Sequence, residues 1–383
     1  MIQSDERFHA ITEAWQALWL KTGATVFQSH PWISECFRYL SRNNVHHHIG
    51  VIWNDDTHLA AVLPLSIRQS KGLKVLEWAA QDFNDYCDGF GDPDALRACW
   101  TALHGHPQYD ILRLKYVRPD AAVASLLHDG WSRDAEGTKC LQLKSQWPTG
   151  DAWLKAHYPK ARNNYSRGLR KLQDHGQVEV SFHVTPPEGT VEHLRILKRD
   201  WGRAIGDPVA LFEEEHLFEQ LVNALASLDR LLMAVVTCDK DIVASSINVP
   251  HGETLLSYFT VYDPKYERAS PGIVLLVEVT RWAFNNGFTV HDHLRGTEPY
   301  KLPFSNEWTM LHGYTGAATA RGHAALMLRR MGAFCRAPPV PGCSGRSIRP
   351  VPSHKQSLRR KFSDGRGQDD RSLTGYRCPG CPA

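Results

Sequence analysis

One order of secondary-structure elements occurs twice in this 383-residue chain. In the first half, strands around Val51 and in "LKVLEWA" precede the helix "DPDALRACWTALHG" and the strand "YDILRLKYV". In the second half, "RLLMAVVTCDKDIVASSINVP" predicts strand, turn and strand, and "TLLSYFTVY", an apolar helix and "FTVHDHL" follow. Val51 and Val235 hold matching places, 184 residues apart. The repeated order predicts two α/β (α+β) domains of one fold, each a mixed, mainly antiparallel sheet flanked by helices.

Composition divides the chain into three parts. We expect a first domain over 1–150 and a second over 151–330, which begins near the basic helix "YPKARNNYSRGLRKLQDHG". Residues 331–383 are rich in Pro, Gly, Ser and Arg and hold few large apolar residues. Such a composition predicts disorder, and a reading-frame error would produce the same pattern.

The balance of charge argues against DNA as a partner. The net charge is +3, but residues 333–383 hold ten Lys and Arg against three Asp and Glu. The rest therefore carries 34 against 38 and is mildly acidic, which gives no extended basic surface.

The compartment expected from the sequence is the cytoplasm. The first residues, "MIQSDERFHAITEAWQ", are charged and lack the apolar core of a signal peptide. No apolar run is long enough for a membrane span. Five scattered cysteines predict buried thiols rather than a disulfide framework, and we expect no metal site because "CPGC" has no partner pair of ligands.

The segment "YERASPGIVLLVEV" predicts an anion site at the start of a buried helix. A helix N-terminus carries unpaired N–H groups and a partial positive charge, and Gly272 lets a ligand approach the backbone. Arg268 adds a cation before the helix. A pyrophosphate cradle would then be formed by Arg268, Ser270, Gly272, Ile273 and Val274. The alternative, which the loop alone supports equally, is a plain helix-entry turn.

The equivalent helix start in the first half carries carboxylates. "DGFGDPDALRA" places Asp88, Asp92 and Asp94 there, and these would repel a phosphate. We therefore expect the second half to be active and the first to be a degenerate structural or substrate-shaping copy.

The segment "VHDHLRGTEPYK", residues 290–301, predicts a site at the end of a strand. Strand alternation places Asp292 on one face and His291 and His293 on the other. Further titratable groups follow at once, and the predicted cradle precedes them by one helix. The alternative is a solvated strand end with ordinary surface charges, which is also the interpretation favoured for the acids of "DFNDYCDGF".

Three segments carry a family resemblance: "SYFTVYDPKYERASPGIVLL", "GFTVHDHLRGTEPYK" and, upstream, "KARNNYSRGLRKL". Over roughly residues 25–320 the chain resembles GNAT-superfamily acyltransferases of the CelD-like, cellulose-biosynthesis-associated family, which are related to FemAB-type transferases. The resemblance implies tandem GNAT-like domains. The usual cradle pattern is Arg/Gln-x-x-Gly-x-Gly/Ala; here Arg268 is kept, but Pro271 and Ile273 replace the glycines and only Gly272 remains.

The resemblance also implies a reaction. An acyl group, with acetyl as the first choice, would pass from acyl-CoA to an amine of a small-molecule or polysaccharide-precursor acceptor, without a metal. Asp292 is the first choice for the base or the amine-orienting carboxylate and His291 the second. Tyr300 would protonate the thiolate, with Tyr258 as the alternative, and Tyr258 lies on the strand expected beside pantetheine. The acceptor would be bound by Arg295, Glu298, Lys301, Arg162 and Arg167.

Two other functions stay open at this point. One is a FemAB-like transferase that uses aminoacyl-tRNA, and the other is a non-catalytic GNAT-fold partner in envelope polysaccharide synthesis.

Overall fold

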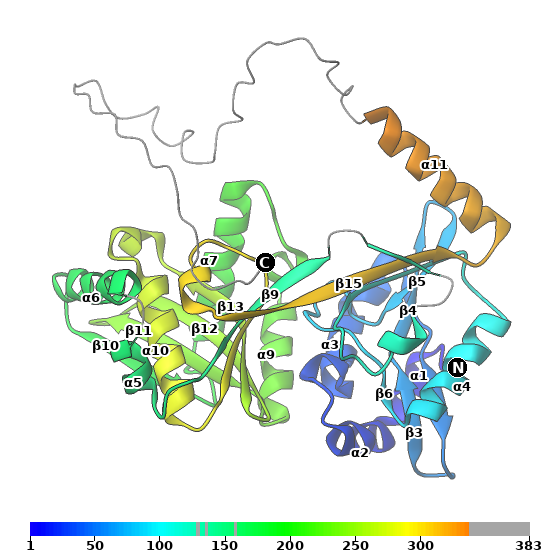
Figure 1. Ribbon diagram of the computed structural model, residues 1–383, viewed down its shortest axis with the longest axis horizontal. Helices are drawn as coiled ribbons and strands as arrows, with labels where there is room; N and C mark the ends of the chain where they lie inside the picture. Colours follow the sequence, from blue (N-terminus) through cyan, green and yellow to red (C-terminus); the bar gives the residue numbers. More distant parts are fainter. Residues whose placement is uncertain (128–130, 135–136, 157–158, 337–383) are drawn as a thin grey trace, which may run out of the picture. The chain divides into compact units, whose positions relative to one another are not determined.

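The computed structural model describes residues 1–127, 131–134, 137–156 and 159–336. Contacts divide the chain into two units, Met1–Met331 and Gly332–Ala383, and the description below concerns the first. Apart from the end of the last helix, the expected disordered tail lies outside the described residues. Figure 1 shows the ribbon.

The N-terminal half (residues 1–150) begins with three α-helices and continues mainly with strands. One long helix, α4, lies between β6 and β7 in the chain. Its elements are α1 (Asp5–Ala10), α2 (Thr12–Thr22), η1 (Val26–Gln28), α3 (His30–Leu40), η2 (Ser41–Asn43), β1 (Val45–His47), β2 (Gly50–Trp53), β3 (Leu59–Leu63), β4 (Leu65–Ser70), β5 (Leu73–Trp78), β6 (Phe90–Gly91), α4 (Pro93–Gly105), β7 (Ile111–Val117), η3 (Ala124–Leu126), β8 (Ser132–Arg133) and β9 (Thr138–Lys144).

The C-terminal half (residues 151–331) has longer strands and the buried helix α10. Its elements, with the flanking helix ends, are α5 (Gly150–Ala156), α6 (Pro159–Gln173), β10 (Val178–His183), α7 (Thr190–Ile205), α8 (Ala210–Glu213), α9 (Leu217–Ser227), β11 (Leu232–Cys238), β12 (Asp241–His251), β13 (Thr254–Tyr262), η4 (Pro264–Ala269), α10 (Pro271–Asn285), β14 (Val290–Arg295), η5 (Leu302–Phe304), β15 (Glu307–Ala317) and α11 (Ala320–Arg336).

A 12-stranded sheet joins the two halves. Its order is β1-β4-β5-β7-β15-β9-β14-β13-β12-β11-β10, with β8 paired to β15, and β2-β3-β6 form a separate sheet. Strand β15 pairs with β9 through its first residues and with β7 through its last, and Figure 1 shows it as one long strand. Strand β9 in turn pairs with β14. The halves therefore exchange strands across residue 150, and the expected domain boundary there stays a prediction.

The mixed, mainly antiparallel sheet flanked by helices confirms the expected fold class. The repeat is also present, because β5 and β7 are parallel neighbours joined through α4, as β13 and β14 are through α10. The expected match of Val51 with Val235 is wrong: β2 belongs to the small sheet and β11 to the large one. The chain leaves one sheet for the other at Pro64, between β3 and β4, and proline cannot donate to a strand ladder.

Helices cover both faces of the C-terminal part of the sheet. Along β11, Met233 and Val235 pack in the cluster that includes α1–α3 and α9, whereas Leu232 and Ala234 pack against α10 on the other face. A third cluster packs α4 on the N-terminal strands. The five cysteines expected as buried thiols, Cys36, Cys87, Cys99, Cys140 and Cys238, are buried and unpaired. Among the described residues, no helix is both long and apolar enough to cross a bilayer.

Candidate functional site

Strands β13 and β14 run together for three residue pairs and then diverge. The last pair is Leu256 with Asp292. Strand β13 continues to Tyr262 with β12 on its other side, and a register shift at Ile247 and Asn248 leaves Tyr258 without a paired residue. We call the space flanked by residues 257–262 and 293–295 the β13–β14 opening. Backbone groups of β13 that would otherwise bond to β14 face it.

Helix α10 begins just beyond the end of β13, after η4. Ser270 is left-handed, with φ 54°, and its carbonyl accepts the N–H groups of Ile273 at 3.0 Å and Val274 at 3.3 Å. Pro271 has no N–H. Among the described residues, the Gly272 N–H has no partner, so it is the amide that α10 offers to an anion. The expected contribution of the Ile273 and Val274 amides is thereby reduced, because both are already bonded.

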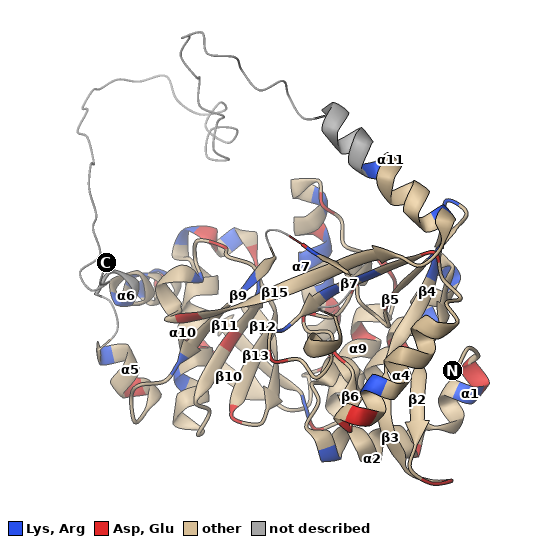
Figure 2. Ribbon diagram, turned by 45° about the vertical axis from the view of Figure 1, so that its right-hand side comes forward, with Lys and Arg blue, Asp and Glu red and all other residues tan. Residues whose placement is uncertain are grey.

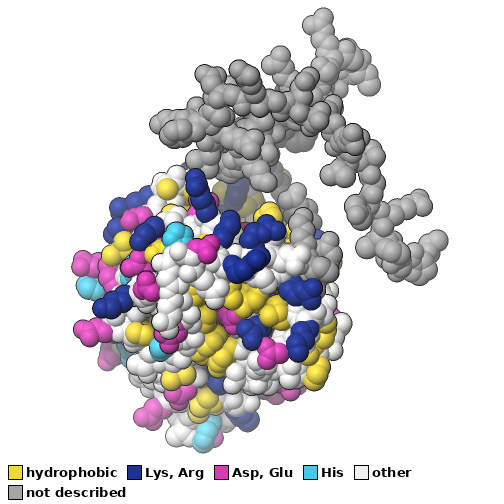
Figure 3. Space-filling view, turned by 90° about the vertical axis from the view of Figure 1, so that its left-hand side faces the viewer, with side chains coloured by type: hydrophobic (Ala, Val, Ile, Leu, Met, Phe, Trp, Pro, Cys, Tyr) yellow, Lys and Arg dark blue, Asp and Glu magenta, His cyan; other side chains and the backbone are white. Residues whose placement is uncertain are grey.

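Basic residues border the start of α10. Arg268 is exposed, and its carbonyl accepts Lys171 Nζ of α6 at 2.9 Å. Gly168 lets α6 approach, since a Cβ there would lie 2.6 Å from the Ala269 carbonyl oxygen. Arg167 is exposed one position before Gly168 and four before Lys171. Figure 2 shows blue Lys and Arg segments on α6, and Figure 3 shows such side chains around apolar ones on this side of the molecule.

Arg162 lies elsewhere on α6. Its guanidinium donates to the Lys155 carbonyl at 3.1 Å, near the end of α5. The structure therefore separates Arg162 from the start of α10, which Lys171 borders.

Asp292 lies at the inner end of the opening and is only 1% exposed. Its carboxylate accepts hydrogen bonds from the Tyr86 hydroxyl at 2.6 Å, Gln142 Nε2 at 2.7 Å and the Leu294 N–H at 2.8 Å. Burial raises the pKa of Asp292 above its ordinary value although these donors favour the charged form. The carboxylate is therefore a stronger base than a solvated aspartate.

The His291 side chain points to the opposite face of the sheet from Asp292, and a hydroxyl group lies within hydrogen-bond distance of each of its ring nitrogens. Its Nε2 lies 2.7 Å from Ser257 Oγ and its Nδ1 2.8 Å from Thr280 Oγ1 of α10. Burial and the neighbouring His293 lower the pKa of His291 well below its ordinary value. The ring is fully buried and neutral, and neither nitrogen is available to a ligand in this arrangement.

A loop of the N-terminal half contacts two more of the expected site residues. Tyr258 donates its hydroxyl to the Phe83 carbonyl at 3.0 Å. Arg295 forms an ion pair with Asp85, and its guanidinium lies 3.8 Å from the Tyr116 ring centre. Asp85 is 7% exposed and is thus not part of the solvated loop that charge alone predicts, whereas Asp82 of the same segment is exposed.

The same loop supplies Tyr86, so the segment Phe83–Tyr86 contacts Tyr258, Asp292 and Arg295 of the C-terminal half. Burial and the Asp292 charge raise the pKa of Tyr86 well above its ordinary value, which keeps its hydroxyl protonated. Sequence reasoning missed this tyrosine because its partner is 206 residues away.

The turn after β14 is held together by contacts among its own residues. Lys301 Nζ lies 2.9 Å from Glu298 Oε2 and donates to the Arg295 carbonyl at 3.0 Å. Lys301 is 9% exposed, so its charge serves the turn. Tyr300 is 43% exposed, and desolvation by its neighbours together with the Glu298 charge raises the pKa of Tyr300 to about 12. A tyrosine with this pKa keeps its hydroxyl protonated at neutral pH and can act as a hydrogen-bond donor.

Lys198 of α7 is a further candidate that the sequence did not reveal. Its Nζ lies 4.4 Å from the Trp201 ring centre and 5.3 Å from that of Phe259, and it donates to the Thr260 carbonyl at 3.4 Å. Burial lowers the pKa of Lys198 to about 8. The amine therefore lies beside β13 at the opening.

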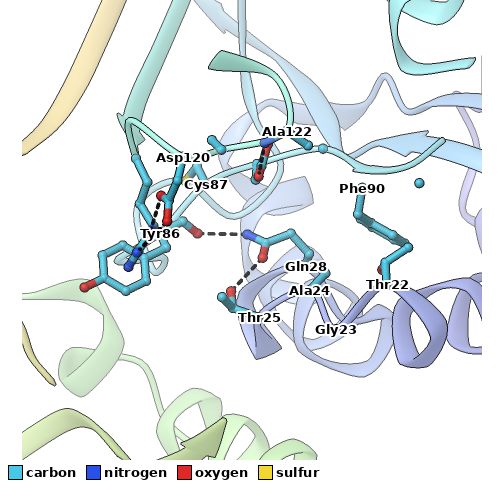
Figure 4. A pocket seen from close by; sticks show the side chains of 15 residues that line it. Thr22, Gly23, Ala24, Thr25, Gln28, Tyr86, Cys87, Phe90, Asp120 and Ala122 are labelled. Atoms are coloured by element: carbon cyan, nitrogen blue, oxygen red, sulfur yellow. Dashed lines mark hydrogen bonds and ion pairs between the residues drawn. The ribbon is translucent and has the colours of Figure 1, made fainter. Parts of the chain in front are cut away.

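A cavity of about 510 Å³ reaches Asp292 from the side of the N-terminal half. Both halves line it, with Thr25, Tyr86, Arg118, Asp120, Gln142, Lys144, His251, Thr254, Leu256, Val290, Asp292, Glu307 and Thr309. A second cavity of about 310 Å³ shares Thr25, Tyr86, Arg118 and Asp120 with it. Figure 4 shows the second cavity, where Gln28 bridges Thr25 and the Tyr86 carbonyl while the Tyr86 ring points away. Within the described part of the chain, no group of three or more His, Cys, Asp or Glu residues could hold a metal ion.

Comparison with known proteins identifies part of the chain. Residues 159–302 match the family model of an acetyltransferase (GNAT) domain. This match covers β10 to β14 and hence the β13–β14 opening and the start of α10. This part of the C-terminal half is therefore similar to GNAT acetyltransferase domains, while membership of the CelD-like family stays a prediction. A search of curated proteins found no match.

Solved structures extend the likeness to both halves. FemX is 11% identical, with 85% of this chain and 99% of that chain covered and a TM-score of 0.53. The C-terminal domain of an Agrobacterium fabrum protein described as a lysylphosphatidylglycerol synthetase is 14% identical, with 85% and 97% covered and a TM-score of 0.51. L-PGS from Bacillus licheniformis is 12% identical, with 87% and 97% covered and a TM-score of 0.50. At these identities the likeness shows the fold alone.

Proposed function

We propose that the protein is an acyl-CoA-dependent N-acyltransferase that transfers an acyl group, with acetyl as the first candidate, to an amine of a small-molecule or polysaccharide-precursor acceptor. One observation carries the proposal. Strands β13 and β14 diverge after Leu256 and Asp292, and α10 begins just beyond the edge of β13 that β14 leaves unpaired. An extended pantetheine arm can add to that edge as a strand would, with its phosphates at the helix start.

The cofactor would be held mainly by backbone groups. The edge of β13 around Tyr258 and Thr260 would bond to the pantetheine amides. The Gly272 N–H, the dipole of α10 and Arg268 would take the pyrophosphate, with the exposed Ser270 hydroxyl beside them. Arg167 would be the cation for a further phosphate because it lies on the α6 face that borders η4.

The reaction requires a free amine and a proton for the leaving group. The amine nitrogen attacks the thioester carbonyl carbon, the carbon–sulfur bond breaks, and the electron pair leaves with sulfur. We assign Asp292 to accept a proton from the amine, because its raised pKa makes it the stronger base and His291 has both nitrogens engaged. Tyr300 would protonate the departing thiolate, and solvent would restore the Tyr300 proton, since this side chain is 43% exposed. Glu298, Lys301 and Arg295 would hold the turn around the reacting groups.

A second function is favoured by the shape of the cradle. Pro271 has no N–H, and the Ile273 and Val274 N–H groups are bonded to Ser270, so one amide remains for pyrophosphate. A FemAB-like transferase that uses aminoacyl-tRNA needs no such cradle, and the cations of α6 would meet the nucleic acid. A non-catalytic GNAT-fold partner is the third candidate and would bind neither cofactor productively. For all three we propose a cytoplasmic location.

Calorimetric titration of acetyl-CoA and longer acyl-CoAs into the full chain tests the proposal. Gly272→Asp places a carboxylate at the free amide, whereas Gly272→Ala adds only a methyl group, and a Cβ there meets Tyr262 at an ordinary 3.4 Å. Aspartate at a helix start is favourable, so both variants should fold. We expect Gly272→Asp to abolish binding and Gly272→Ala to retain most of it. Failure of every acyl-CoA to bind the folded protein would overturn the proposal in favour of aminoacyl-tRNA or a non-catalytic role.

A further inference from the structure

We propose that the 510 Å³ cavity between the two halves is the acceptor site, and that it takes a cationic primary amine whose other groups are uncharged hydroxyls, as in an amino sugar. The assignment of this ligand as acceptor rests on the proposed acyl transfer, but its binding does not. The cavity is in the size range of small-molecule sites, and Asp292 connects it to the β13–β14 opening.

The position of the cavity separates the two substrates. Helix α10 packs against one face of the C-terminal sheet, and the cavity lies on the other, between that sheet and the loop of the N-terminal half that carries Tyr86. Leu256 and Asp292 are the last paired residues before the strands diverge, and both line the cavity. An amine in the cavity and a thioester in the opening would therefore meet at Asp292.

The charges lining the cavity select a monocation. Arg118 is paired with Asp120, at 2.8 Å, and Lys144 with Glu307, at 2.6 Å, so each cation has a counter-charge beside it. Burial, with the charges of Arg230 and Arg118, lowers the pKa of His251, which keeps that ring neutral. The ionised Asp292 then leaves the lining with a net charge of −1.

The remaining lining is polar but uncharged. Thr25, Thr254, Thr309 and Gln142 contribute hydroxyl and amide groups. The Thr25 and Thr309 hydroxyls donate to Gln28 and Gln142, which leaves their oxygens able to accept hydrogen bonds from a ligand. These groups suit the hydroxyls of a sugar ring better than an apolar amine. The second cavity adjoins at Thr25 and Tyr86 and offers room for a further ring or substituent.

The ammonium group has a defined place in this arrangement. A carboxylate has about four lone-pair positions, and Asp292 uses three of them for Tyr86, Gln142 and the Leu294 N–H. The fourth can accept from the amine, and the Tyr86 hydroxyl oxygen can accept a second N–H because its own proton is directed to Asp292. Gln28 Nε2 donates to the Tyr86 carbonyl at 2.9 Å and so holds the Tyr86 backbone in place.

Calorimetry on the full chain, with D-glucosamine as the probe and without acyl-CoA, tests the site. N-acetylglucosamine keeps the hydroxyls but lacks the charge, and glucosamine 6-phosphate adds an anion, so both should bind at least about tenfold more weakly, the size of one lost charged hydrogen bond. Thr309→Trp should fill the cavity and abolish glucosamine binding while acetyl-CoA binding and the melting temperature stay as in the wild type.

Two charge variants should change the affinity for glucosamine in opposite directions, which a purely structural role would not produce. Glu307→Gln removes a negative charge and should weaken glucosamine about threefold, whereas Lys144→Gln should strengthen it about threefold, as expected of half-exposed charges. Equal binding of glucosamine and N-acetylglucosamine, unchanged binding in Thr309→Trp, or no binding of glucosamine at all would overturn the inference. Acetyl-CoA binding without glucosamine binding would refute this site alone, and the reverse result would refute the proposed function while leaving the amine site standing.

Discussion

The ion pair between Asp85 and Arg295 joins the two halves, and its removal should destabilise the protein measurably. The two side chains are 10% and 27% exposed. Breaking a buried pair from one side costs about 3–5 kcal/mol because the other charge is left uncompensated. In Asp85→Asn, Arg295 would keep the Tyr116 ring, at 3.8 Å, and its partial contact with water, which together offset about 1 kcal/mol. We expect the free energy of unfolding to fall by about 2–4 kcal/mol.

Equilibrium unfolding in urea at pH 7 measures this difference. Glu307→Gln is the matched control, because its pair with Lys144 is about half exposed and should be worth at most about 1 kcal/mol. The double variant Asp85→Asn/Arg295→Met should cost less than the sum of the two single changes, since no unpaired charge remains. A free energy of unfolding for Asp85→Asn equal to that of Glu307→Gln would refute the assignment of a buried pair between the halves.

Three further outcomes follow from the same geometry. Asp292→Asn should lower kcat by about 100-fold or more and leave the KM for acetyl-CoA unchanged in steady-state assays; equal kcat would remove Asp292 from the mechanism. Tyr86→Phe removes a donor that lowers the pKa of Asp292, so the acidic limb of the pH–rate profile should shift to higher pH, and an unmoved limb would contradict the contact. The pKa of Lys198 is lowered to about 8 from 10.5, so at this group the unfolded chain binds more protons between these values, and Lys198 contributes a free energy of unfolding that rises with pH across that window. Burial raises the pKa values of Cys87, Cys99 and Cys140, which contribute the opposite slope in every variant that keeps them. Urea titrations should therefore give a more positive slope against pH in the wild type than in Lys198→Met, and identical slopes would count against a desolvated amine.

The sequence predicted the elements whose causes are local. Asp92 caps α4 by accepting the N–H groups of Asp94 and Ala95, and the pattern of that segment marks both ends of the helix. The buried α10 follows from its apolar run, and the strand that carries Asp292 follows from the alternation after it. Each of these features is decided within about one turn or one strand, so the order of elements could be predicted without tertiary information.

The contacts between the halves could not be predicted in the same way. The acids of "DFNDYCDGF" favour a solvated loop by charge alone, but Asp85 is buried because Arg295, 210 residues later, reaches it. Likewise, the hydrogen bond from Tyr86 to Asp292 joins residues that lie 206 positions apart. Local propensity does not contain either partner, so both features required the folded chain.

The proposed acyl-CoA site lies between β13 and β14, with the phosphates at the start of α10. Amide hydrogen exchange of the full chain, with and without saturating acetyl-CoA, would locate the bound cofactor. We expect slower exchange in peptides that contain residues 257–262 and 270–274, since the unpaired edge of β13 and the Gly272 N–H would gain partners. Unchanged exchange in both segments, with or without protection elsewhere, would contradict it.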